Sequence, residues 1–193
     1  MDSPRFAPAG LLIEHDGRRV MLDGGPGAEP SPPIVAWLMT DRKAELIHEI
    51  RDLASVLGVS PEVRTFRGPA GLEIAPRQVE HTSHETYGYL VRAEGRKIVW
   101  APEFSRFPRW AAKADLMFAD AAGWDRPIRF AGGVGGHVAA LDMAKEAQAR
   151  GVRRLVLAHI GRPTIRAIDA GERPTFGSLG HDGAVYLPRR WRD

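Results

Sequence analysis

Two pairs of short apolar segments in the chain have the sequence pattern of β-hairpins. GLLIEH and RRVMLDGG flank Asp16 and Gly17, and GYLVRA and RKIVWA flank Glu94 and Gly95. An acidic residue followed by glycine is typical of two-residue hairpin turns, because both turn positions need a positive φ. The pattern therefore predicts two antiparallel strand pairs.

A buried strand followed by an amphipathic helix is predicted between these hairpins. IVAWLM has the length and β-branched content of a short buried strand. Apolar residues then recur at helical spacing at Leu46, Ile47, Ile50, Leu53, Ala54 and Leu57. We expect Thr40 or Asp41 to cap this helix and Gly58 to end it.

The second half of the chain alternates strands and helices. DLMFAD is a predicted strand, HVAALDMAKEAQARG is a helix that opens at His137 and ends at Gly151, and RRLVLAHI is a buried strand. Residues 162–183 are rich in glycine and proline, so a loop is expected there. Hairpins followed by a β-α-β pattern predict a single mixed α/β domain over residues 1–193, with layered sheets.

Composition and charge narrow the class of protein. The 193 residues include no cysteine, which excludes disulfides and thiolate zinc sites. The apolar run PIVAWLM is too short to span a membrane, and the N-terminus lacks the pattern of a secretory signal, so a cytoplasmic protein is expected. The net charge is +3. Because the arginines are scattered through the chain, nucleic-acid binding is disfavoured.

Four of the seven histidines fall where predicted strands or helices begin or end, which is where α/β proteins place binding and catalytic groups. They are His81, His84, His137 and His159. His137 follows GGVGG at a predicted helix start, where free backbone N–H groups attract an anion and lower the pKa of the imidazole. These four histidines are the first candidates for a functional site.

Five segments, in their order along the chain, resemble the metallo-β-lactamase fold. They are LLIEHDGRRVMLDGGPG, VEHTSHETYGYLV, RKIVWAPEF, ADLMFADAAGW and GGHVAALDMAKEAQARGVRRLVLAHIG. The resemblance covers roughly residues 9 to 162 and is strongest to the branch that contains RNase Z-type endonucleases and related phosphodiesterases. It implies a four-layer αβ/βα sandwich with a metal site at one edge. Because only residues 1–8 precede the first hairpin, either the first edge strand of the family is absent or the chain is an abbreviated member.

The resemblance also implies metal ligands. His81 is similar to the third-motif histidine ligand, with His84 as a substitute because the spacing to Gly88 is one residue longer than in the family. Glu103 stands where the family has the aspartate that bridges two metals. His159 matches the last histidine ligand.

Three further residues take supporting or catalytic roles by the same resemblance. Asp23 matches the strand-end aspartate that buttresses the metal loop. Asp120 stands where the RNase Z branch has a glutamate that contacts the catalytic loop. His137 is similar to the histidine that assists phosphodiester cleavage, and we expect it to act as a proton donor.

The most specific motif of the family, His-x-His-x-Asp-His, is absent. Thr40 is followed at the signature positions by Asp41, Lys43, Glu45 and Leu46. Carboxylates can still bind a metal, whereas leucine has no lone pair and lysine must first lose a proton. The loop over residues 41–46 is therefore a catalytic loop that has degenerated or been rebuilt.

One metal ion at most is expected, because both available ligand sets need Glu103. One set is Asp41, His81 and Glu103, and the other is Glu45, Glu103 and His159. Each set holds more oxygen than nitrogen, which moves the preference from Zn²⁺ toward Mn²⁺, Fe²⁺ or Mg²⁺. Alternatively, the Lys43 ammonium stands where a metal would be and neutralises Glu45 and Glu103 with no cofactor.

Two functions follow from these alternatives. The first is a hydrolase with an atypical, at most mononuclear metal site that acts on an ester or phosphodiester of a small-molecule or phosphoester substrate. Asp41 and Lys43 join His137 as its candidate catalytic residues. The second is a metal-free, non-hydrolytic relative that binds a ligand or partner. An exposed sheet edge at the first hairpin also makes a homodimer an expectation.

Overall fold

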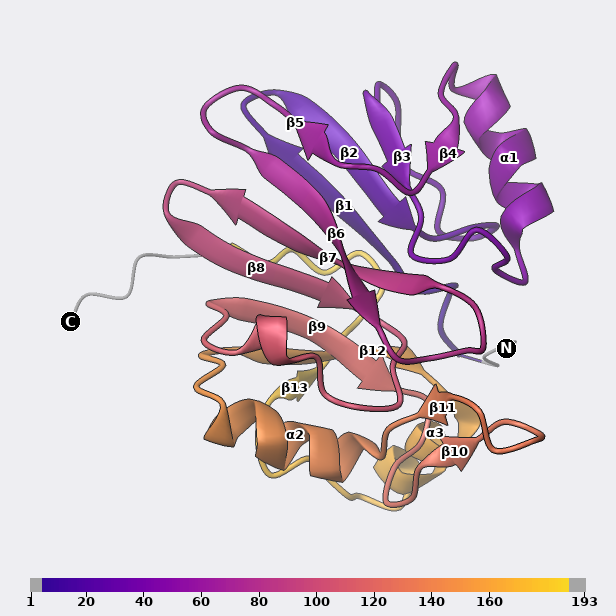
Figure 1. Cartoon of the computed structure of the whole chain (residues 1–193), viewed down its shortest axis with the longest axis vertical. Helices are drawn as coiled ribbons and strands as arrows, with labels where there is room; N and C mark the ends of the chain where they lie inside the picture. The colour runs from indigo at the N-terminus through magenta and orange to yellow at the C-terminus, as the bar shows by residue number, and fades with distance from the viewer. Residues whose placement is uncertain (1–4, 188–193) are drawn as a thin grey trace.

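Two β-sheets face each other and helices cover both outer surfaces, as the computed structural model shows for residues 5–187 (Figure 1). α1 (Ile47–Val56) packs on the four-stranded sheet, and α2 (Ala140–Ala149) and α3 (Arg162–Asp169) pack on the seven-stranded sheet. The layers therefore run helix, sheet, sheet, helix. This confirms the predicted αβ/βα sandwich.

The four-stranded sheet is built from the N-terminal part of the chain. Its order is β1 (Gly10–His15), β2 (Arg18–Asp23), β3 (Ala36–Leu38) and β4 (Pro61–Glu62). Positive φ values of 48° at Asp16 and 69° at Gly17 confirm the first predicted hairpin turn. Among the residues that the structure describes, none adds a strand beyond β1, which therefore forms a sheet edge.

The seven-stranded sheet contains the second predicted hairpin. Its order is β13 (Ser178–Leu179), β12 (Leu155–Ile160), β9 (Leu116–Ala121), β8 (Arg96–Ala101), β7 (Thr86–Ala93), β6 (Glu73–Val79) and β5 (Phe66–Arg67). β8, β9 and β12 are parallel, and β6 runs in their direction because both β6 and β8 are antiparallel to β7. The carboxyl ends of these four strands thus meet at one edge.

A short two-stranded ribbon lies beside that edge. It is formed by β10 (Ile128–Arg129) and β11 (Gly136–His137). The 3₁₀-helix η1 (Arg109–Ala111) lies between β8 and β9 in the chain. In Figure 1 the ribbon lies next to α3 at the end of β9 and β12. The ribbon brings residues 130–137 to the edge where the parallel strands end.

Three apolar clusters hold the layers together. Tyr89 and Trp100 are buried between the sheets, Met143 lies between the seven-stranded sheet and α2, and Trp37 and Ile50 lie between the four-stranded sheet and α1. Full burial of one large apolar side chain contributes roughly 1.5–3 kcal/mol. These clusters hold the two sheets and the helices together and so support the edge where the parallel strands end.

Three expectations about helices are wrong. α1 begins at Ile47 with Leu46 at the cap position and no side-chain cap, because the Asp41 carboxylate is engaged elsewhere. α2 begins at Ala140, since His137 is paired in β11. Residues 162–183 contain α3 and β13 in place of a long loop. Pro163 in the first turn favours a helix start there, and buried apolar positions then anchor α3.

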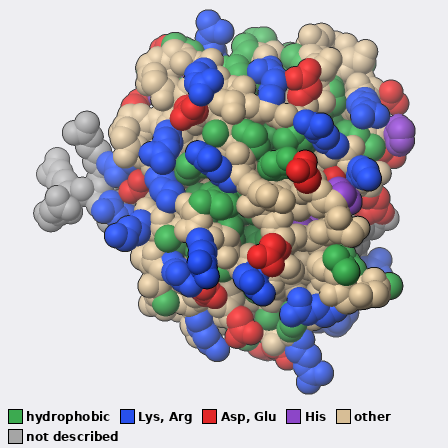
Figure 2. Space-filling model, viewed as in Figure 1, with side chains coloured by type: hydrophobic (Ala, Val, Ile, Leu, Met, Phe, Trp, Pro, Cys, Tyr) green, Lys and Arg blue, Asp and Glu red, His purple; other side chains and the backbone are tan. Residues whose placement is uncertain are grey.

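The surface carries mixed charge. On the face shown in Figure 2, Lys and Arg side chains are spread among Asp and Glu side chains. Several arginines are used in exposed ion pairs, such as Arg67 with Glu73 and Arg150 with Glu146. Such pairs contribute little to stability, typically about 0–1 kcal/mol each. Among the described residues, no helix combines the length and apolar content needed to cross a membrane.

Candidate metal centre

The candidate site lies where parallel strands of the large sheet end. His81 follows β6, Glu103 follows β8, and His159 lies near the end of β12. His137 comes from the neighbouring ribbon, in β11. We call these four residues the histidine cluster. Because the strands share a direction, residues far apart in the sequence are delivered to one place.

The His81 ring is fixed by the glycine loop. Its Nδ1 lies 2.9 Å from the Gly136 carbonyl oxygen, which only an N–H donor on Nδ1 can satisfy, so Nε2 carries the lone pair. The Gly136 N–H in turn donates to the His81 carbonyl at 2.8 Å. A Cβ on Gly135 would lie 1.9 Å from that same carbonyl oxygen. Glycine is therefore required for this approach, which leaves Nε2 of the buried His81 free.

His137 is oriented by a buried carboxylate. Its Nδ1 lies 2.8 Å from Asp120 Oδ2, so Nε2 is again the free nitrogen. Asp120 is fully buried and also accepts hydrogen bonds from the backbone N–H groups of Phe104 and Ala122. A histidine held through its second nitrogen by a carboxylate is the usual arrangement behind a metal-binding imidazole. Sequence reasoning placed Asp120 near the site but missed this partner.

The charge environment of His137 differs from the expectation. Burial lowers the pKa of the imidazole, but the hydrogen bond to Asp120 and the negative charges of Asp120 and Glu103 raise it by more. The pKa of His137 therefore lies above its ordinary value. The expected lowering by a helix N-terminus was wrong, because His137 precedes the helix and faces carboxylates.

A local irregularity in β12 places His159. The pairing of β12 with β9 shifts register between Ala158 and Ile160, and His159 has a φ of 48°. Such a bulge turns a side chain out of the regular alternation and often lies next to a functional site. Here the His159 ring stacks on the His137 ring, with centroids 5.3 Å apart and planes 12° from parallel.

Donor atoms of the histidine cluster lie close to one another. His81 Nε2 lies 3.6 Å from Glu103 Oε2, and His159 Nε2 lies 3.3 Å from Glu103 Oε1. Both exceed the range of good hydrogen bonds. Ligand atoms around a tetrahedral ion with bonds of about 2.0–2.2 Å are separated by about 3.3–3.6 Å. Donor atoms of His81, Glu103 and His137 all lie within 4.8 Å of one another.

The loop over residues 41–46, which we call the rebuilt loop, does not join this cluster. Lys43 and Glu45 are exposed, and Leu46 packs with the apolar residues of α1. Asp41 is buried, but its carboxylate accepts the Lys43 N–H at 2.7 Å and faces His84 Nε2 at 2.9 Å.

Both ligand sets predicted from the sequence need correction. Among the residues that the structure describes, neither Asp41 with His81 and Glu103 nor Glu45 with Glu103 and His159 converges as a ligand set. The Lys43 ammonium has no ion pair within the described chain, so it does not replace a metal between Glu45 and Glu103. The register question is also answered by geometry, since His81 faces Glu103 while His84 faces Asp41.

Asp23 supports the start of the rebuilt loop. Its Oδ1 accepts hydrogen bonds from the backbone N–H and hydroxyl of Thr40 at 2.7 and 2.9 Å, and Oδ2 accepts Trp100 Nε1–H at 2.6 Å. Burial raises the pKa of Asp23 to about 7, although these hydrogen bonds act in the opposite direction. Asp23 thus fixes Thr40, as expected for a residue that buttresses the loop.

Comparison with known proteins identifies the family. A family model described as a beta-lactamase superfamily domain matches residues 31–160. This protein belongs to the metallo-β-lactamase superfamily. None of the curated protein sequences matches the chain.

Solved structures of the superfamily share the fold. YhfI from Bacillus subtilis, a metallo-β-lactamase fold protein, has a TM-score of 0.71 at 14% identity, over 94% of this chain and 92% of its own. Zn²⁺-bound PqqB from Methylobacterium extorquens has a TM-score of 0.66 at 16% identity, over 92% and 87%. A diphosphatase of the PhnP family has a TM-score of 0.64 at 17% identity, over 90% and 80%. At these identities, the likeness concerns the fold.

A two-metal site of the superfamily type does not fit this chain. The histidines of the superfamily signature are replaced in the rebuilt loop, and its one buried carboxylate, Asp41, is occupied by His84. The histidine cluster by itself offers enough donors for one ion. The described residues that converge provide a donor set for one metal ion.

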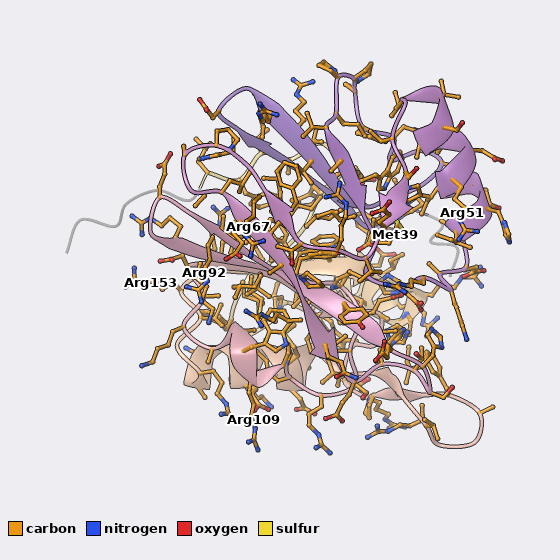
Figure 3. All side chains as sticks on the ribbon, turned by 45° about the horizontal axis from the view of Figure 1, so that its top comes forward. Met39, Arg51, Arg67, Arg92, Arg109 and Arg153 are labelled. Atoms are coloured by element: carbon orange, nitrogen blue, oxygen red, sulfur yellow. The ribbon has the colours of Figure 1, made fainter. Side chains whose placement is uncertain are left out.

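A separate groove of about 270 Å³ opens beside the rebuilt loop, between α1 and β4. It is lined by Met39, Arg42, Ile47, Arg51, Pro61, Glu62 and Val63. Figure 3 labels Met39 and Arg51 on this side of the molecule. No residue of the histidine cluster lines the groove, so it is a surface feature apart from the candidate metal centre.

Proposed function

We propose that this protein is a hydrolase with a single divalent metal ion held by His81, Glu103 and His137. The observation that carries the proposal is the convergence of these three donors, with the other nitrogen of each imidazole already hydrogen-bonded. Ligand histidines oriented in this way are what a metal site requires. Three protein ligands also leave a coordination position open, which catalytic sites need.

His159 completes the cluster from the other side of Glu103. Its Nε2 faces Oε1 of Glu103, while His81 faces Oε2. We infer that His159 keeps the Glu103 carboxylate in place, so that the three ligands leave one coordination position open. Its removal should weaken metal binding, whereas loss of Glu103 should abolish it.

The donor set favours a different metal from the one expected from the sequence. Two imidazoles and one carboxylate form a nitrogen-rich set, and imidazole suits Zn²⁺ or Fe²⁺ better than Mg²⁺. A bound ion would supply Lewis-acid polarisation of the substrate oxygen and a lower pKa for a water molecule. The protein itself would hold the cluster rigid through Asp120 and Gly136.

An ester or phosphodiester is the substrate class that we propose. Support comes from the fold-level likeness to a protein described as a diphosphatase, which is an argument by analogy. The partly exposed side chains of Glu103 and His159 leave the cluster accessible to a ligand. The metal-free alternative rests on the loss of the superfamily signature, and the experiment below decides between them.

Elemental analysis of protein purified without added metal tests the proposal. We expect about one equivalent of zinc or iron, and a melting temperature that falls when a chelator is added. Binding should weaken as the pH drops, because protons compete for His137, whose pKa is raised. Protein without bound metal that fails to take up Zn²⁺ or Fe²⁺ in calorimetry would favour the metal-free alternative.

A further inference from the structure

A second histidine–aspartate pair lies on the rebuilt loop. His84 Nε2 is 2.9 Å from both carboxylate oxygens of Asp41, so its N–H points between them. The Asp41 side chain is 9% exposed and that of His84 is 30% exposed. The carboxylate is thus largely shielded from water, while the imidazole reaches the surface of the site.

Local hydrogen bonds hold this pair in place. The Asp41 carboxylate also accepts the Lys43 N–H, and the Thr82 hydroxyl donates to the His84 carbonyl at 3.0 Å. With Nε2–H directed at Asp41, Nδ1 is the ring nitrogen that faces away from it. No described residue bonds to Nδ1. This arrangement resembles the base and orienting carboxylate of a catalytic triad.

The pair lies close to the histidine cluster. His84 is three residues after His81, and three residues of chain span at most about 11 Å. Asp41 directly follows Thr40, whose carbonyl accepts the Tyr87 N–H at 2.9 Å, which ties the rebuilt loop to the start of β7. The Cα atoms of His81 and His84 are therefore at most about 11 Å apart, and the proposal requires the His84 ring to reach a substrate bound at the cluster.

We propose that His84 donates the proton to the leaving group and that Asp41 positions it, an inference that rests on the proposed function. A water oxygen bonds to the phosphorus or carbonyl carbon, and the bond to the leaving oxygen breaks with its electron pair on that oxygen. The proton donor is the imidazolium form of His84, which carries a proton on each ring nitrogen, and the leaving oxygen takes the proton on Nδ1 while Nε2–H stays on Asp41. The proton lost by the water returns to the imidazole through solvent, so ester and water give acid and alcohol.

His137 is less suited to this role, although its family position suggested it. Its free Nε2 is one of the converging donor atoms of the cluster, and Nδ1 is held by Asp120. A nitrogen that binds a metal has no proton to give. His84 has the complementary arrangement, with the carboxylate on Nε2 and an available Nδ1.

The test compares leaving groups in the metal-loaded protein. Bis(p-nitrophenyl) phosphate releases a weak base that needs no proton, whereas diphenyl phosphate releases phenoxide, which is as basic as a tyrosine side chain with a pKa of about 10. His84→Gln should slow diphenyl phosphate hydrolysis roughly 100-fold or more and the nitrophenyl ester less than about 10-fold. Asp41→Asn should show the same selectivity with a smaller loss. His48→Gln, on the exposed side of α1, is the matched control.

Metal content and NMR separate the possible failures. His84→Gln should keep one equivalent of metal, and loss of metal would make His84 a ligand and overturn the assignment. An equal loss of activity with both esters, or no loss with either, also overturns it. If wild-type protein hydrolyses neither ester, the proposed function fails. The His84 assignment then requires that inorganic phosphate shift the His84 ring signals of the metal-loaded protein, and unmoved signals reject it.

Discussion

The histidine cluster and the rebuilt loop lie at the same edge of the sandwich, but they are built differently. In the cluster, His81 and His137 each have one nitrogen hydrogen-bonded and the other free. In the rebuilt loop, the one buried carboxylate, Asp41, is already hydrogen-bonded to His84 Nε2 and to the Lys43 N–H. One region thus presents free donor atoms, whereas the carboxylate of the other is paired within the protein. The two regions should therefore respond differently to metal.

The largest expected effect comes from removing the carboxylate of the cluster. Glu103→Ala should reduce metal content from about one equivalent to none, because this side chain faces both His81 and His159. Elemental analysis after dialysis measures the change. Asp41→Asn is the matched substitution in the rebuilt loop and should leave metal content unchanged. Equal metal loss in both variants would show that the histidine cluster and the rebuilt loop form one metal site.

Asp23 contacts Thr40, just before the rebuilt loop, and Trp100 in β8, and its burial predicts a pH dependence of stability. Burial raises the pKa of this carboxyl to about 7. Between about pH 4 and pH 7 the Asp23 carboxyl is therefore protonated in the folded state and ionised in the unfolded state. The stabilisation is complete at low pH and is lost as the pH rises toward 7, by up to about 4 kcal/mol at 1.36 kcal/mol per pKa unit.

Urea unfolding at pH 5 and pH 8 measures this effect. We expect the free energy of unfolding of the wild type to be lower at pH 8. Asp23→Asn should remove most of the difference, at the cost of an unfavourable contact with the Trp100 N–H. An equal pH dependence in wild type and variant would show that Asp23 is ionised in the folded state throughout.

Much of the fold and part of the site could be predicted from the sequence. The hairpin turns at Asp16 and Glu94 have strong local signals, and strand ends at His81, Glu103 and His159 could be placed by apolar runs. The partner of each polar group could not be predicted, because it depends on contacts across the fold. His84 is near His81 in sequence, yet its carboxylate comes from residue 41.

Backbone irregularities explain other misses. The bulge that turns His159 toward Glu103 leaves no mark in the run LVLAHI, since a one-residue register shift depends on the neighbouring strand β9. The sequence predicts a loop in place of α3 because glycine and proline are frequent around it and the helix is only eight residues long. Sequence signals of this kind act locally, whereas the site is assembled by the sheet.

A smaller effect is expected from the residue behind His137. Asp120→Asn keeps the shape of the side chain, but removes the charge that orients and polarises the imidazole. Substitutions of such supporting groups typically weaken metal affinity about 10–100-fold. Competition with a zinc-sensitive dye would measure the change in dissociation constant. Asp142→Asn, on the surface of α2, is the control. Unchanged affinity would mean that His137 is not a ligand.

The smallest expected effect comes from Lys43, the residue for which the metal-bound and metal-free alternatives predict different changes in stability. If its ammonium neutralised Glu45 and Glu103, Lys43→Ala would destabilise the fold by roughly 3–5 kcal/mol, as loss of a buried partner does. The structure places Lys43 at the surface, with only its backbone N–H bonded to Asp41. We therefore expect a change within about 0.5 kcal/mol, typical of an exposed substitution. Urea unfolding of the chelator-treated protein measures it. A loss of several kcal/mol under those conditions would show that the stability of the rebuilt loop depends on Lys43. The hydrogen bond between His84 and Asp41 would then not be sufficient to hold the loop.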